Sequence, residues 1–134
     1  MALLFDEITF RYGRRTPVFS GFTLTVSAPA TVLLGPNGAG ESTLMALAAS
    51  RLTPTAGTLS FNRLRPGGRK QAAYRKSVAW IPQQITPVPG LTVREQVAYA
   101  GWLKGMRRGA AWEASGTAIE RVGLGTLANR KSHS

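Results

Sequence analysis

The chain has 134 residues, of which 43% are hydrophobic, and it contains no cysteine. That length supplies one domain, the apolar fraction suffices for a packed core, and the missing cysteines exclude disulfides, thiolate metal sites and a cysteine nucleophile. The formal net charge of +11 raises the hypothesis of nucleic-acid or anionic-membrane binding.

The basic residues are spread along the sequence rather than gathered in one tract. No acidic residue lies between Ser42 and Arg94. Within that stretch the cations fall in expected loops and turns: Arg51, Arg63, Arg65, Arg69, Lys70, Arg75 and Lys76. The aromatic residues among them are too sparse for a base-stacking platform, so we expect a basic surface that faces solvent or a partner.

The first segments of the chain read as strands. Residues 3–12 alternate in part between apolar and polar side chains and predict a strand, which we expect at the edge of a sheet. Residues 13–15 form a turn to a second strand at 22–26. Residues 31–34 are almost wholly apolar, which is typical of a strand buried on both faces of a parallel sheet.

The middle of the chain alternates between helix and strand signals. Residues 42–50 are rich in Leu and Ala and predict a helix. After turn residues at 54–57, residues 58–61 predict a strand, and residues 78–81 predict a further buried strand.

Two helices are expected in the last third of the sequence. Thr92 and Glu95 form a capping box, in which each side chain satisfies a free backbone N–H of the other residue. The helix that they begin continues to Leu103, and a second helix runs from about residue 110 to 122. Residues 129–134 contain no core-forming side chain.

A glycine-rich segment lies between the strand expected at 31–34 and the following helix. It comprises Gly35, Pro36, Asn37, Gly38, Ala39, Gly40, Glu41, Ser42 and Thr43, and is called the phosphate loop below. Glycines let the backbone adopt positive φ, so that several N–H groups converge on one phosphate, and the helix N-terminus adds further donors and a positive dipole end. In this motif the Ser42 hydroxyl ligates Mg²⁺ and Thr43 reaches a phosphate oxygen, but Glu41 stands where the motif has Lys.

The sequence of the phosphate loop is similar to that of the ABC-transporter ATPases: it reads Gly-Pro-Asn-Gly-Ala-Gly, one further residue, and then Ser-Thr-Leu. Tyr12 resembles the aromatic residue on which adenine stacks in that family. Gln83 resembles the glutamine that senses the γ-phosphate through Mg²⁺ and water, and residues 91–95 resemble the opening of the helical subdomain. The resemblance covers essentially the whole chain.

The resemblance implies an α/β P-loop NTPase domain of the ABC type, with an antiparallel β hairpin region, a partial parallel sheet and the start of the helical subdomain. Residues 1–83 would form the β-rich core with the phosphate loop, and residues 84–134 part of the helical subdomain. The implied cofactors are ATP and Mg²⁺, bound by Tyr12, the phosphate loop and Gln83, with Ser42 and Gln83 near the metal.

The resemblance also implies partners and a location. They are transmembrane permease subunits, a second nucleotide-binding domain, and the cytoplasmic face of the cell membrane, reached through the permease. No apolar run approaches the roughly 18 residues of a membrane span, so a membrane would be reached through a partner.

Three further parts of the family pattern would follow Ser134: a Leu-Ser-Gly-Gly-Gln signature, a motif of apolar residues then Asp-Glu, and a switch histidine. We therefore expect an incomplete domain without the carboxylate that polarises the attacking water. Residues 2–7 also read as apolar residues then Asp-Glu, but they precede the phosphate loop, and we interpret them as an ordinary strand. His133 receives no role.

Glu41 and the missing motifs lead to the hypothesis that this chain binds ATP weakly and does not hydrolyse it. Three functions stay open in this order: an ATP-hydrolysing transporter subunit, a non-catalytic remnant that docks on a permease through residues 83–103, and a basic nucleic-acid-binding protein.

Overall fold

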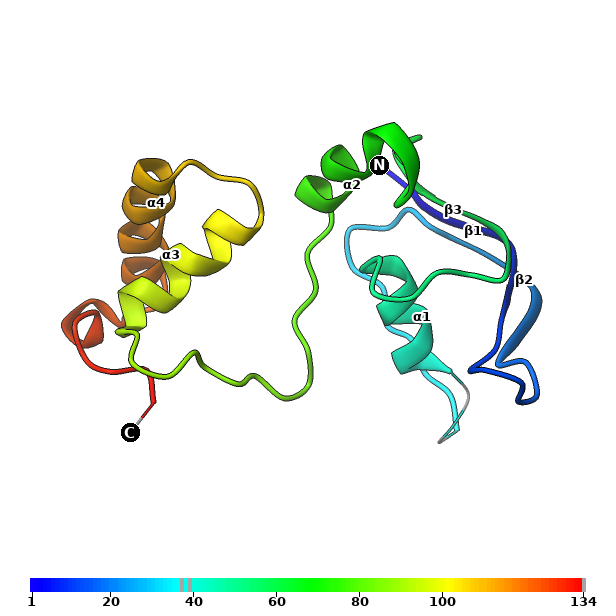
Figure 1. Ribbon diagram of the computed structural model, residues 1–134, viewed down its shortest axis with the longest axis horizontal. Coiled ribbons are helices and arrows are strands. Elements are labelled where there is room, and N and C mark those ends of the chain that lie inside the picture. Colours follow the sequence, from blue (N-terminus) through cyan, green and yellow to red (C-terminus); the bar gives the residue numbers. More distant parts are fainter. Residues whose placement is uncertain (37, 39, 134) are drawn as a thin grey trace. The chain divides into compact units, whose positions relative to one another are not determined.

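The computed structural model of the protein describes residues 1–36, 38 and 40–133. The chain divides into two compact units, Met1–Trp80 and Ile81–Ser134, which are coloured blue to green and yellow-green to red in Figure 1. The first unit contains the sheet and two helices, and the second is helical.

Three strands make up the sheet of the first unit: β1 (Leu3–Phe10), β2 (Phe19–Val26) and β3 (Ala56–Phe61). β1 lies in the middle and pairs antiparallel with both others, with Phe5 opposite Leu24 on one side and Leu59 on the other. The expectation that the first strand lies at the sheet edge is therefore wrong. Alternation shows that one face of a strand is buried, but it does not show how many neighbours the strand has.

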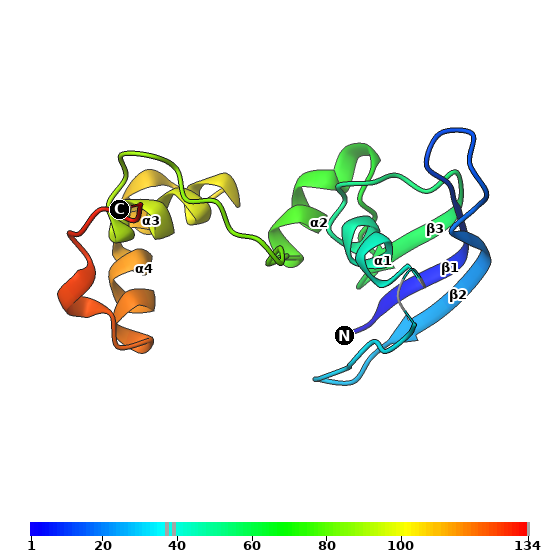
Figure 2. The same cartoon turned by 90° about the horizontal axis from the view of Figure 1, so that it is seen from below.

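The core of the first unit lies between the sheet and two helices, α1 (Glu41–Ala48) and α2 (Gln71–Ser77). Figure 2 shows both helices on the same side of the sheet. The buried cluster draws on all these elements: Phe5, Ile8, Phe10, Leu44, Leu47, Ala48, Leu59 and Tyr74. Each large apolar side chain in it contributes about 1.5–3 kcal/mol to folding, and together they fix α1 against β1.

The sequence does not predict α2, because the basic residues of this segment are expected in loops and turns. Tyr74 is the one buried residue among the seven of α2. The segment therefore has no repeating apolar positions from which a helix could be predicted. Tyr74 is 0% exposed, and its Oη donates a hydrogen bond of 2.5 Å to the Ala48 carbonyl. Burial raises the pKa of Tyr74 to about 12. Tyr74 thus holds α2 against the end of α1, and Arg75 Nε adds a hydrogen bond to Ser50 Oγ at 3.2 Å.

The structure corrects the prediction of parallel strands at 31–34 and 78–81. Neither segment is a strand, and every strand pair within the described residues is antiparallel. Val32 is 77% and Leu34 90% exposed, and Ile81 is 79% exposed. A buried parallel strand needs hydrogen-bonding neighbours and cover on both faces, which the described residues do not give these two segments.

The second unit is built on α3 (Val93–Leu103) and α4 (Arg108–Arg121). The predicted capping box is confirmed: the Thr92 amide donates to Glu95 Oε2 at 2.7 Å, and the Glu95 amide donates to Thr92 Oγ1 at 3.2 Å. Arg94 joins the helices, because its guanidinium lies 4.1 Å from the Trp112 ring centroid and its Nη2 donates to the Trp112 carbonyl. None of the described helices has the length and apolar character to cross a membrane.

The last residues of the second unit bind the start of α3. The Val93 amide donates to the Arg130 carbonyl at 2.8 Å, and the Ser132 amide donates to the Leu91 carbonyl at 2.9 Å. Lys131 Nζ donates to the Gly90 carbonyl at 2.6 Å. These contacts are made mainly by backbone groups. They could not be predicted from the side chains of this segment, none of which is core-forming.

Candidate functional site

The phosphate loop leads directly into α1. Gly38 has φ 84° and Gly40 has φ 100°, so both occupy the left-handed region that glycine adopts without strain. Gly40 is the N-cap of α1, and no side chain caps that helix end. The first backbone N–H groups of α1 have no hydrogen-bond partner within the helix, so they can bind an anion. Asn37 and Ala39, both predicted to bind nucleotide, lie outside the described residues.

Gly40 is held against the beginning of β2. A Cβ atom placed on Gly40 would lie 2.9 Å from Val18 Cγ1 and 2.7 Å from Phe19 Cζ, closer than real Cβ contacts. Positive φ and lack of space therefore both require glycine at this position. The contact fixes the end of the phosphate loop to the first unit's sheet.

The side chains at the start of α1 differ in exposure. Thr43 is buried, with 6% of its surface exposed, while Ser42 is exposed and Glu41 is half-buried at the first helical position. A carboxylate there interacts favourably with the positive end of the helix dipole. Glu41 occupies the position of the motif's Lys. Its negative charge repels a phosphate, which the Lys would attract.

Tyr12 joins the same site from the end of β1. Its Oη lies 2.9 Å from Thr43 Oγ1, a hydrogen bond in which either hydroxyl can donate. The Tyr12 ring packs edge-on against Phe10, with 4.9 Å between ring centroids, and the residue is 46% exposed. The sequence predicts that the Tyr12 ring stacks on adenine, but it does not predict the hydrogen bond of the Tyr12 hydroxyl. That bond joins residues 31 positions apart.

The remaining predicted site residues are Gly35, Pro36 and Gln83. Gly35 and Pro36 are exposed and precede α1. Gln83 belongs to the second unit, where its side chain is exposed. Its role near the γ-phosphate and Mg²⁺ stays a prediction.

Comparisons with known proteins place the chain among transporter proteins. The family model described as ABC transporter matches residues 20–134. The taurine import ATP-binding protein TauB of Chromobacterium violaceum is 33% identical over 125 residues, which cover 92% of this chain and 46% of that protein. The cytochrome c biogenesis ATP-binding export protein CcmA of Cupriavidus pinatubonensis is 32% identical over 122 residues, covering 89% of this chain and 51% of its own length.

A solved structure titled as the ATP binding subunit of an ABC transporter superposes with a TM-score of 0.81 at 23% identity, covering 100% of this chain and 56% of that one. This likeness confirms the predicted ABC-type P-loop fold. The chain spans about half the length of the curated relatives that it matches. From the family match and the shared fold it follows that this chain belongs to the ABC transporter family.

Proposed function

We propose that the chain is the phosphate-loop part of an ATP-binding subunit that couples ATP binding and hydrolysis to transport across a membrane. The observation that carries the proposal is the junction between the phosphate loop and α1. There Gly38 and Gly40 have positive φ, no side chain caps the helix, and hydroxyl groups stand at its first turn. ATP-binding proteins of import and export systems are among the relatives.

The described residues fit a magnesium triphosphate in most respects. The amides of the phosphate loop and of the first turn of α1 would bind the β- and γ-phosphates. Ser42 would ligate Mg²⁺, Thr43 would bind a phosphate oxygen, and Tyr12 would stack on adenine. Gln83 would sense the γ-phosphate through Mg²⁺ and water.

Glu41 is the exception. A pair of unit charges about 4 Å apart near a protein surface is worth roughly 4 kcal/mol, and Glu in place of Lys changes that attraction into repulsion. Salt and Mg²⁺ reduce the effect, but each 1.4 kcal/mol still lowers affinity about tenfold. The backbone donors do not depend on residue 41, so we expect weak ATP binding and no hydrolysis by this chain.

Titration of MgATP into the purified chain, followed by calorimetry, tests the proposal. We expect weak binding by the wild type, binding at least tenfold tighter by E41K, and loss of the Mg²⁺-dependent part of that binding in E41K/S42A. Micromolar affinity of the wild type, or ATP turnover that S42A removes, would contradict the weak-binding hypothesis. Failure of both the wild type and E41K to bind would overturn the nucleotide site itself.

In the whole protein we propose transmembrane permease subunits and a second nucleotide-binding domain as partners, at the cytoplasmic face of the membrane. A second candidate function is docking on a permease without turnover. It is favoured by an open groove of about 780 Å³ in the second unit, lined by Tyr99, Trp102 and Trp112 from α3 and α4. Trp102 is 49% and Trp112 43% exposed, and large aromatic side chains are frequent anchors of protein interfaces.

Affinity purification of the tagged chain from detergent-solubilised membranes, with and without MgATP, tests this second function. We expect a permease subunit to be retained equally in both conditions and lost with W102A/W112A. V122A is the matched control, because Val122 is exposed at the end of α4 and does not line the groove. Retention that is unchanged in W102A/W112A, or that requires MgATP, would contradict nucleotide-independent docking.

A further inference from the structure

The turn between β1 and β2 carries a concentration of positive charge beside the candidate site. Residues 11–18, called the arginine turn below, contain Arg11, Arg14 and Arg15, all of them exposed. Within the described part of the chain no acidic side chain forms an ion pair with any of the three. Three guanidinium groups are thus free to bind an anion.

Both ends of the arginine turn contact the phosphate loop. At its start the Tyr12 hydroxyl is hydrogen-bonded to Thr43, and at its end Val18 and Phe19 pack on Gly40. The turn is closed by hydrogen bonds from the Arg15 amide to the Tyr12 carbonyl at 3.2 Å and from the Val18 amide to the Phe10 carbonyl at 2.8 Å. The two ends of the turn are therefore held near the start of α1, and Figure 1 shows the turn and that helix start at the same end of the sheet.

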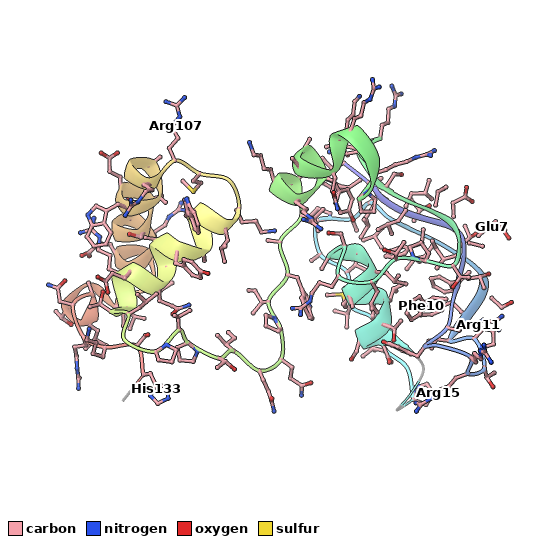
Figure 3. All side chains as sticks on the ribbon, viewed as in Figure 1. Glu7, Phe10, Arg11, Arg15, Arg107 and His133 are labelled. Atoms are coloured by element: carbon pink, nitrogen blue, oxygen red, sulfur yellow. The ribbon has the colours of Figure 1, made fainter. Side chains whose placement is uncertain are left out.

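The three arginines are not equivalent. Phe10 and Tyr12 are two residues apart, and their rings pack together on the α1 side of β1. Because side chains alternate along a strand, Arg11 is placed on the opposite face, and Figure 3 shows it extending away from α1. Arg14 and Arg15 lie beyond Tyr12, in the segment between the two contacts that the ends of the turn make with Thr43 and Gly40.

We propose that Arg14 and Arg15 supply the positive charge to a bound polyphosphate that Glu41 fails to supply from within the phosphate loop. The inference rests on the proposed function, since it assigns further ligands to the same site. Guanidinium groups suit the role, because they are always charged and can donate two parallel hydrogen bonds to phosphate oxygens. The ligand recognised by this pair is the phosphate chain, not the base.

Inorganic tripolyphosphate with Mg²⁺, titrated into the whole chain at one low ionic strength, is the probe. We expect R14Q/R15Q to bind it roughly tenfold more weakly than the wild type, as the loss of two exposed ion pairs predicts. R14K/R15K, which keeps the charge, should retain most of the binding. Circular dichroism melting curves of all variants establish that the fold is kept.

Matched controls separate a local role from the effect of net charge. R65Q/R69Q removes the same charge elsewhere on the first unit, and R11Q removes one charge from the opposite face of the turn; each should change the affinity less than twofold. In the E41K background, where the phosphate loop has its own cation, the effect of R14Q/R15Q should become smaller.

An equal loss of affinity in R14Q/R15Q and R65Q/R69Q would overturn the inference, because binding would then follow net charge alone. If E41K binds MgATP but wild-type chain binds no tripolyphosphate, the inference also fails, while the proposed function stands. If neither wild type nor E41K binds MgATP or tripolyphosphate, both proposals are wrong.

Discussion

The Tyr12 hydroxyl lies 2.9 Å from the Thr43 hydroxyl, which joins the end of β1 to the first turn of α1. The residue expected to stack on adenine is therefore bonded to the residue expected to bind a phosphate. One contact positions the arginine turn, the aromatic ring and the phosphate loop with respect to one another.

Y12F keeps the aromatic ring and removes this hydrogen bond. We expect the free energy of unfolding to fall by about 0.5–1.5 kcal/mol, because the buried Thr43 hydroxyl loses its partner. Tripolyphosphate binding should weaken as well, because the arginine turn is less firmly held. Urea unfolding measures the first effect and calorimetry the second. Y99F, at an exposed tyrosine of α3, is the control, and an equal effect there would refute the assignment.

Tyr74 predicts a loss of stability at high pH. Burial raises its pKa from 10.0 to about 12, so above pH 10 the unfolded chain releases the proton while the folded chain keeps it. This group's contribution is constant below about pH 10 and falls by roughly 3 kcal/mol as the pH rises to about 12. Urea unfolding between pH 9 and 12 measures the slope. Y74F should show a shallower slope, and identical slopes in the two proteins would contradict the prediction.

The capping box predicts a pH effect of the opposite sign. The backbone amide of Thr92, followed by its side chain, lowers the pKa of Glu95 from the ordinary 4.5, with Lys131 adding a smaller attraction. The stability that this carboxylate adds to the second unit is present above about pH 4.5 and is lost as the pH falls through the lowered pKa.

T92A should destabilise α3 by about 1 kcal/mol and move the pKa of Glu95 upward. Circular dichroism at 222 nm with urea, together with NMR titration of the Glu95 carboxyl group, measures both quantities. T92S, which keeps the hydroxyl, should behave like the wild type. An unchanged Glu95 titration in T92A would show that the Thr92 side chain does not help to lower the pKa of Glu95.

Residues 31–34 predict self-association of the chain. Val32 and Leu34 are 77% and 90% exposed, and their segment belongs to none of the strands in the described residues. Exposed apolar strands with free N–H and C=O groups pair with other chains. Sedimentation velocity should show concentration-dependent association that V32T/L34T reduces and V122T does not. A wild-type monomer at every concentration would contradict this expectation.

The elements that sequence patterns predicted well are those whose signal is local. The helix after the phosphate loop, the capping box and the strands around residues 3–12 and 58–61 depend on short-range periodicity and capping chemistry, and the structure confirms them within a few residues. Positive φ at Gly38 and Gly40 followed from the motif in the same way.

The features that were missed depend on contacts between distant residues. The central place of β1 depends on two partners, and the short helix α2 is held by contacts of Tyr74 and Arg75 with the end of α1 and the residues after it. Residues 31–34 have the composition of a buried strand, but a strand also needs neighbours, which composition cannot supply. The bond between Tyr12 and Thr43 likewise has no counterpart in local spacing.

We propose that this chain keeps the backbone donors of a nucleotide site and that Glu41 alone weakens the binding of nucleotide there. Calorimetric titration of MgATP into wild type, E41Q and E41K tests it most directly. We expect the affinity for MgATP to rise stepwise as the charge at position 41 changes from negative to neutral to positive, by at least tenfold in all. Equal affinities in the three proteins would contradict it.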